Sequence, residues 1–389
     1  MRIAFLTLGC KFNQYETEMI KEYHLRKGDV IVNYNDTPDI TYVNTCTVTG
    51  LAGHQSRNLY RRALKSSKKV RVLGCHAKLF PEEFPGAEFF DISKIEDRNT
   101  LQQRTRAYVR IQKGCDNFCT YCIVPYARGK NISFPPEKII DEVKRKIDVG
   151  FKEVVLTGIH IGNYNYDGIT ISGLLERLLK LNIQIRLSSM KPDRIDKKLI
   201  DLFSLSNLAP HLHISQQSGD NKILKKMGRH YKKEDTLRIV DAIRNVRSDV
   251  NFGADFIVGF PGEDEDAFDR SVSLIKEAGI SYLHIFRYSP RPFTLAAHFP
   301  DQVPDRVRKE RAERLRKLGD EMSYKFRGKL VGKIYRVIPE RKQDSEERLY
   351  YGFTPNYIRV LFSRDRVREV VPVRITRITM DRTYGERAE

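Results

Sequence analysis

Residues 107–122 read AYVRIQKGCDNFCTYC, which predicts a strand over 107–115 that runs into a loop with three cysteines. Cys115, Cys119 and Cys122 have the spacing C-x3-C-x2-C. Three thiolates leave both a tetrahedral metal site and an iron–sulfur cube one ligand short. The loop therefore raises the question of what completes the set.

Five more predicted strands follow this loop, and each precedes a helical pattern such as 135–150 or 265–279. Six strand–helix units are too few for a complete eight-fold barrel, so they predict an open, partial (β/α)6 barrel. Functional groups in such barrels lie at the carboxyl ends of the strands, which is where the cysteine loop lies. The later strands are predicted at 153–162, 183–190, 212–217, 250–260 and 282–290.

The first hundred residues predict a separate, open α/β sheet domain (1–100) whose strands also end on cysteines, namely Cys10, Cys46 and Cys75. The carboxyl ends of parallel strands converge on one edge of a sheet, so we expect these three thiols to be neighbours. The alternative is three unrelated buried cysteines, since free cysteine is among the most buried residue types. The strands are predicted at 2–10, 40–46 and 70–75, with a helix over 13–28.

A polar stretch, 97–106, predicts a linker into the central domain (101–325), which ends in a charged helix over 304–325.

Short alternating runs from 326 to 389 then predict a small antiparallel β-barrel. From Lys325 to Glu389 there are 16 Lys and Arg and 9 Asp and Glu, a net charge of 16 − 9 = +7. Small barrels with basic and aromatic residues on one face commonly bind RNA, although each ring could instead fill the barrel core. The residues concerned are Arg348, Tyr350, Tyr351, Phe353, Tyr357 and Arg359.

The whole chain has 389 residues and a net charge of +19, which makes nucleic acid the first partner to consider. The alternative is that the protein is basic in general, without a nucleic-acid partner.

No apolar stretch approaches the roughly 20 residues of a membrane helix, and the apolar run in MRIAFLTLGC is too short for a secretory signal of about 15–30 residues. We therefore expect a cytoplasmic protein whose six cysteines are reduced thiols rather than disulfides.

Zinc binding and redox exchange are two other uses of clustered cysteines. Zinc sites usually pair C-x2-C with a second pair, and none lies nearby. His76 and His160 could donate, but neither has the spacing of a zinc motif. A redox pair of Cys119 and Cys122 would leave Cys115 without a role, whereas iron–sulfur clusters are held by thiolates.

The C-x3-C-x2-C spacing resembles that of the radical S-adenosylmethionine enzymes. In that family three thiolates hold a 4Fe–4S cluster, and S-adenosylmethionine chelates the fourth iron. The complete layout resembles the methylthiotransferases, which join an N-terminal cluster domain, a radical S-adenosylmethionine barrel and a C-terminal TRAM domain. The motifs that carry the resemblance are TLGCKFNQYETE (7–18), NTCTVT (44–49), GC (74–75), GCDNFCTYCIVPYARG (114–129), LTGIHIGNY (156–164), LHISQQSGDNKILKKMGRHY (212–231), DFIVGFPGE (255–263) and FRYSPRP (286–292).

The resemblance implies two 4Fe–4S clusters as cofactors, one on each cysteine trio, together with S-adenosylmethionine. No side chain beyond the cluster ligands is given a catalytic role. Tyr121 would lie near the adenine of the cofactor, and Gly158 near its methionine amino group. Ser188, Gln217 and Val258 would lie at later strand ends near ribose or adenine, although ordinary barrel packing explains them equally well.

The activity implied is the replacement of the C2 hydrogen of an adenine by a methylthio group. One S-adenosylmethionine would methylate a sulfur at the N-terminal cluster, and another would be cleaved to a 5′-deoxyadenosyl radical at the central one. LGCKFNQYETE (8–18) and GFTPNYIRV (352–360) are most similar to the branch that modifies N6-threonylcarbamoyladenosine at position 37 of tRNA. Other branches modify isopentenyladenosine in tRNA or an aspartate of a ribosomal protein, and a non-catalytic iron–sulfur RNA-binding protein is a further alternative.

The partners implied are the anticodon stem-loop of tRNA and a one-electron donor such as flavodoxin or ferredoxin, with the protein itself a monomer.

Three positions depart from the family pattern. Lys191 replaces an acidic residue, Ser215-Gln216-Gln217 replaces Pro-Leu-Gln, and His76 replaces a tyrosine after the third cysteine. His76 would either tune the N-terminal cluster or simply pack.

Overall fold

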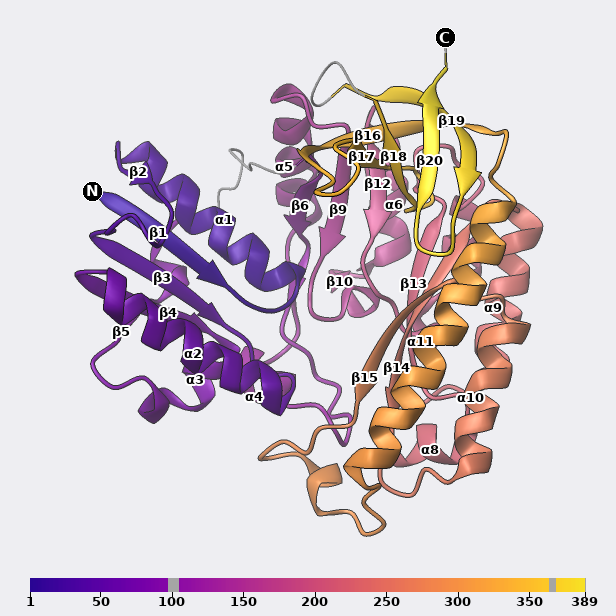
Figure 1. Ribbon diagram of the computed structural model, residues 1–389, viewed down its shortest axis with the longest axis horizontal. Coiled ribbons are helices and arrows are strands. Elements are labelled where there is room, and N and C mark those ends of the chain that lie inside the picture. The colour runs from indigo at the N-terminus through magenta and orange to yellow at the C-terminus, as the bar shows by residue number, and fades with distance from the viewer. Residues whose placement is uncertain (97–104, 364–368, 389) are drawn as a thin grey trace.

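The computed structural model describes residues 1–96, 105–363 and 369–388, and it shows three units (Figure 1). The linker predicted over 97–106 lies mostly outside the described residues. None of the described helices is long and apolar enough to span a membrane.

The N-terminal unit is an open sheet in which every strand pair is parallel, in the order β2-β1-β3-β4-β5. All six residues of the central strand β3 are buried, because helices cover both faces. Ile40 and Tyr42 pack on the side of α1, while Val43 packs against Tyr60 of α2. The elements are β1 Arg2–Thr7, α1 Lys11–Arg26, β2 Val30–Ile31, β3 Ile40–Thr45, α2 Gly50–Ser66, β4 Lys69–Gly74, α3 Cys75–Leu79 and β5 Glu88–Phe89.

The central unit contains six parallel strands that follow one another in chain order. They form two three-stranded sheets, β6-β9-β12 and β13-β14-β15, which the bridges Ile185–Leu208 and Met190–Ile214 connect. The arc is open, and helices cover its outer face (Figure 1), so the predicted partial (β/α)6 barrel is confirmed. The strands are β6 Ala107–Arg110, β9 Glu153–Thr157, β12 Gln184–Leu187, β13 His211–Gln217, β14 Asn251–Val258 and β15 Tyr282–Arg287.

The helices of the central unit lie between these strands in sequence, except for α11, which follows β15, and short elements complete the unit. The helices are α4 Val124–Arg128, α5 Pro136–Asp148, α6 Ile171–Leu178, α7 Lys197–Leu202, α8 Asn221–Lys226, α9 Lys233–Val246, α10 Glu265–Glu277 and α11 Asp305–Gly328. Two short hairpins pair β7 Gln112–Lys113 with β8 Ile132–Ser133, and β10 Asn165–Tyr166 with β11 Ile169–Thr170.

The C-terminal unit is a closed barrel in the order β16-β17-β18-β20-β19. The prediction of a purely antiparallel barrel is wrong in one respect, because β18 and β20 pair in parallel at Leu361 and Tyr384. β20 returns from β19 as a hairpin and therefore runs in the same direction as β18 when it closes the barrel. The strands are β16 Ile334–Gln343, β17 Tyr350–Phe353, β18 Arg359–Phe362, β19 Val371–Ile378 and β20 Thr383–Arg387.

A buried ion pair joins the barrel to the central sheet. Arg186 on β12 forms a bidentate pair with Glu153 on β9, at 2.7 and 2.8 Å, and also donates to the carbonyl oxygen of Pro355 at 2.8 Å. Phe353 and Tyr357 lie on this side, where the Arg106 guanidinium stacks over both rings. Two of the predicted aromatic residues therefore serve the contact between units.

Removing the carboxylate of this pair tests its contribution to stability. Glu153→Gln leaves a buried guanidinium without its counter-charge, which costs about 3–5 kcal/mol. We expect a clear downward shift of the denaturant midpoint, measured by far-UV circular dichroism. The matched control is Glu137→Gln, which breaks an exposed pair with Arg177 and should cost less than about 1 kcal/mol. Equal shifts for the two variants would contradict this account.

Candidate active site

The structure brings the N-terminal cysteines to one edge of the sheet, after the adjacent strands β1, β3 and β4: Cys46 and Cys75 follow their strands directly, and Cys10 lies three residues after the end of β1. All three are free thiols. Gly9 has a φ of 101°, and a Cβ there would lie 3.2 Å from the Cys46 sulfur, so glycine permits the close approach of the first two loops. Their role as metal ligands stays a prediction.

The central trio occupies the loop after β6 and β7, which other elements hold in place. The Thr120 amide donates to the Met227 carbonyl oxygen at 3.1 Å, and its hydroxyl donates to the Lys226 carbonyl oxygen at 2.8 Å. The Cys115 amide donates to the Gly129 carbonyl oxygen at 2.9 Å. These bonds fix the loop from both ends, which presents its thiols in a defined arrangement.

Arg128, at the end of α4, connects the two trios. Its Nε donates to the Cys75 sulfur at 3.0 Å, and its terminal nitrogens donate to the Glu16 carboxylate and to Asn13 Oδ1. The guanidinium also lies 4.6 Å from the ring of Phe12. A residue six positions after Cys122 thus contacts the other cysteine site directly.

Burial and neighbouring charges shift the pKa values of the thiols in opposite directions. Burial raises the pKa of Cys75 to about 11, while the Arg128 guanidinium acts in the opposite direction. Burial also raises the pKa of Cys122 to about 12. Lys191, which replaces the expected acidic residue, is buried with its Nζ 4.0 Å from the Cys119 sulfur. Burial therefore outweighs the neighbouring cations at Cys75 and Cys122, although the cations act in favour of the thiolate form that a metal ligand requires.

As the structure describes them, neither cysteine trio is drawn together tightly enough to enclose a single zinc ion. Zinc binds thiolates at about 2.3 Å, so three sulfurs on one zinc lie within about 4.6 Å of each other. Among the described residues, which include all six cysteines, no three sulfurs approach within 4.8 Å of one another.

A cavity of about 270 Å³ lies between Cys122 and the loop that follows Cys46. Val48 and Thr49, which follow Cys46, line it from the N-terminal unit, and Tyr121 and Cys122 line it from the central loop. Of the predicted cofactor residues, Tyr121 and Gln217 line this cavity. Gln217 ends β13 with a φ of 74°, a strained conformation of the kind that collects at functional sites.

The other three predicted residues lie at strand ends but outside the lining of this cavity. Gly158 follows β9, where a Cβ would meet Gln112 Oε1 at 2.7 Å, and that oxygen accepts from the amides of the next two residues. Ser188 is buried after β12, and Val258 packs in the barrel core. Their roles near the cofactor stay predictions.

Sequence reasoning missed two arginines of the site, although both lie within quoted motifs. Arg229 is half-buried, donates to the Tyr121 hydroxyl and stacks over that ring, so it fixes the aromatic residue beside the cavity. The second arginine is Arg128, whose contacts with Cys75 and Glu16 are described above.

His76 lies outside the cavity lining. Its ring nitrogens lie 2.6 Å from the Glu83 carboxylate and 3.0 Å from the Thr47 hydroxyl, which supports the packing interpretation.

Two family models match the chain, "Uncharacterized protein family UPF0004" over residues 2–92 and "Radical SAM superfamily" over residues 109–275. The threonylcarbamoyladenosine tRNA methylthiotransferase MtaB of Bacillus subtilis is 34% identical, over 96% of this chain and 93% of that protein. The protein of the same name from Aquifex aeolicus is 36% identical, over 95% and 98%. The tRNA-2-methylthio-N(6)-dimethylallyladenosine synthase of Bacillus subtilis is 30% identical, over 95% and 82%.

Among solved structures, the radical S-adenosylmethionine methyltransferase TsrM from Kitasatospora setae, with cobalamin and a [4Fe-4S] cluster bound, has a similar fold. The TM-score is 0.57 at 13% identity, over 76% of each chain. At this identity the likeness concerns the fold alone, and it agrees with the open parallel barrel described above.

The environment of the thiols predicts their order of reaction with iodoacetamide in the metal-free chain at pH 8. Cys10 is exposed, whereas Cys75 is buried and, with a pKa of about 11, carries only about a thousandth of its population as thiolate. Peptide mass spectrometry should therefore find Cys10 alkylated first. The urea-unfolded chain, in which the two should react alike, is the control. Equal rates in the folded chain would contradict the described burial.

Proposed function

Because the chain belongs to the radical S-adenosylmethionine methylthiotransferases, we propose that it attaches a methylthio group to C2 of N6-threonylcarbamoyladenosine at position 37 of tRNA. The observation that carries this proposal is the position of the cavity. It touches the loop after Cys46 and the loop that contains Cys122 at once. A base bound there would lie against the loop that follows Cys46 and beside Cys122, as a reaction that joins a radical step to sulfur transfer requires.

In the proposal Cys115, Cys119 and Cys122 hold one 4Fe–4S cluster, and Cys10, Cys46 and Cys75 hold a second. When bound, these clusters and two molecules of S-adenosylmethionine supply the electron, the radical and the methyl group. The protein supplies position and charge. Arg229 holds the Tyr121 ring at the cavity wall, and Arg128 and Lys191 offset the negative charge of thiolates.

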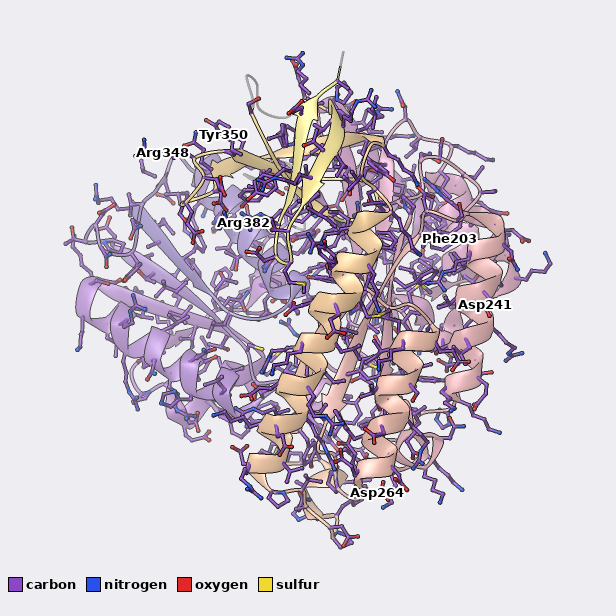
Figure 2. All side chains as sticks on the ribbon, turned by 45° about the vertical axis from the view of Figure 1, so that its right-hand side comes forward. Phe203, Asp241, Asp264, Arg348, Tyr350 and Arg382 are labelled. Atoms are coloured by element: carbon purple, nitrogen blue, oxygen red, sulfur yellow. The ribbon has the colours of Figure 1, made fainter. Side chains whose placement is uncertain are left out.

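The C-terminal unit supports an RNA substrate. Arg359 stacks over Tyr351 and Arg377 over Tyr384, each with 4.1 Å between the guanidinium carbon and the ring centroid. Figure 2 shows Arg348 on the same barrel, and its side chain is exposed. Cations and aromatic rings side by side bind nucleic acid through phosphate contacts and base stacking.

We propose three domains, 1–100 for the N-terminal cluster, 101–325 for the radical barrel and 326–389 as a TRAM domain that binds the anticodon stem-loop. The enzyme would act in the cytoplasm as a monomer, with a one-electron donor such as flavodoxin or ferredoxin. A second candidate substrate is dimethylallyladenosine in tRNA, because relatives named for it match this chain at 29–30% identity over nearly its full length.

Nucleoside analysis distinguishes these substrates. A strain that lacks the protein should lose 2-methylthio-N6-threonylcarbamoyladenosine from its tRNA and keep the methylthio derivative of dimethylallyladenosine, as measured by liquid chromatography and mass spectrometry. Complementation with the unaltered chain should restore the nucleoside, and Cys119→Ala should not. Loss of only the dimethylallyl derivative would transfer the proposal to the second candidate, and loss of neither would overturn it.

The barrel surface makes a separate prediction about tRNA binding. Arg359→Ala removes an exposed cation beside Tyr351, so tRNA affinity should fall several-fold. The slope of log affinity against log salt concentration should also decrease in magnitude by about 1, which corresponds to the loss of one phosphate contact. Fluorescence anisotropy with labelled tRNA measures both. Arg177→Ala, on α6 of the central unit, is the matched control with the same change of charge. Unchanged binding by Arg359→Ala would show that this surface does not contact tRNA.

A further inference from the structure

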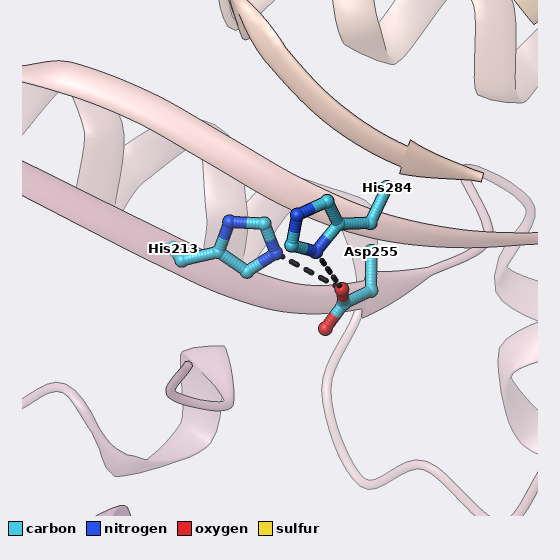
Figure 3. A group of neighbouring side chains, drawn as sticks. All are labelled: His213, Asp255 and His284. Atoms are coloured by element: carbon cyan, nitrogen blue, oxygen red, sulfur yellow. Dashed lines mark hydrogen bonds and ion pairs between the residues drawn. The ribbon is translucent and has the colours of Figure 1, made fainter. Parts of the chain in front are cut away.

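Three potential metal ligands other than the cysteines meet inside the open barrel. His213 on β13, Asp255 on β14 and His284 on β15 come from three neighbouring strands (Figure 3). Asp255 pairs with His284 in the sheet register, and His213 pairs with Gly253, two residues before Asp255. Residues two apart on a strand share a face, so the register brings the three side chains together.

The distances within this group match those of a coordinated ion. His213 Nε2 and His284 Nδ1 lie 3.0 and 3.1 Å from the same oxygen, Asp255 Oδ1. The ligand atoms of all three residues lie within 4.8 Å of one another, which holds for no other group of His, Cys, Asp and Glu among the residues that the structure describes. A metal at about 2.0–2.2 Å from each ligand places neighbouring ligand atoms about 2.8–3.1 Å apart at octahedral angles and about 3.3–3.6 Å apart at tetrahedral angles.

The surroundings orient the two imidazole rings. His284 Nε2 lies 3.2 Å from the Tyr282 hydroxyl, so the nitrogen that faces away from Asp255 has its own partner. The His213 ring packs over Gly253, where a Cβ would lie 2.5 Å from Nδ1. Partners on the far ring nitrogen are what fixes histidine ligands in metal sites. A larger residue at position 253 would displace His213.

One side of the group is open. The side chain of His213 is 5% exposed, that of Asp255 17% and that of His284 45%. Asp255 also lines the cavity described above, beside Tyr121 and Gln217. Three protein ligands with an open position are the arrangement of catalytic rather than structural metal sites. Lys11 is a neighbouring cation that acts electrostatically on His213.

We propose that His213, Asp255 and His284 bind one divalent transition-metal ion, separate from the cysteine sites, with an open position toward the cavity. Two imidazoles and one carboxylate form a donor set that suits Zn²⁺, Fe²⁺ and Mn²⁺. The competing explanation is a hydrogen-bonded group in which Asp255 simply accepts from both imidazoles. The two explanations differ in metal content, which can be measured without any assay of activity.

The test uses the full chain with its cysteine sites loaded with iron and sulfide, so that added metal cannot bind the thiols. Mn²⁺ is titrated in, and free Mn²⁺ is followed by its paramagnetic resonance signal. Zn²⁺ is measured by elemental analysis after gel filtration. His284→Gln is the informative variant, because its half-exposed side chain can change without disturbing the core. His54→Gln, exposed on α2, is the matched control.

We expect one ion per chain in the unaltered protein and in His54→Gln, with affinity lower by about tenfold or more in His284→Gln. Asp255→Asn should lose binding as well, with circular dichroism confirming that it folds. Two results would overturn the proposal. One is the absence of Mn²⁺ and Zn²⁺ binding by the loaded chain, and the other is equal affinity in His284→Gln and the unaltered protein.

Discussion

The contact between the Arg128 guanidinium and the Cys75 sulfur holds the two halves of the candidate site together. The loop of the central cysteines continues into α4, and Arg128 at its end reaches into the N-terminal unit. An arginine with a side chain only 12% exposed needs a partner of opposite charge, and Glu16, with a side chain 4% exposed, supplies it. This buried ion pair and the thiol beside it therefore help to fix the relative position of the two cysteine sites, together with the bond from Arg291 to Thr47.

The N-terminal unit and the central barrel place their functional side chains in the same way. Parallel strands end at a common edge, and short loops there present side chains that lie far apart in sequence. In the N-terminal sheet these are Cys10, Cys46 and Cys75, and in the barrel they include Gln217 and the loop with Cys122. The cavity lies where the two edges face each other, so the site is a product of how the units pack and not of either unit alone.

The sequence predicted the secondary structure of this arrangement well, because long buried strands and amphipathic helices carry strong local patterns. It also placed each N-terminal cysteine at a strand end. It did not reveal the partner of Arg128, since Glu16 is 112 residues away and nothing local identifies a pair at that separation. Phe353 and Tyr357 were grouped with the RNA-binding residues because packing between units leaves no periodic signal. The parallel pairing of β18 with β20 was missed for a similar reason, because barrel closure depends on strand order in space.

The central claim is that the six cysteines form two separate sets, each of which holds its own cluster. Iron content of the anaerobically reconstituted chain tests it most directly, with one triple variant for each set: Cys10, Cys46 and Cys75 to Ala, and Cys115, Cys119 and Cys122 to Ala. The account predicts about eight irons per unaltered chain and about four in each variant, since each cube contains four. About four irons in the unaltered chain, with no loss in the N-terminal triple variant, would contradict it.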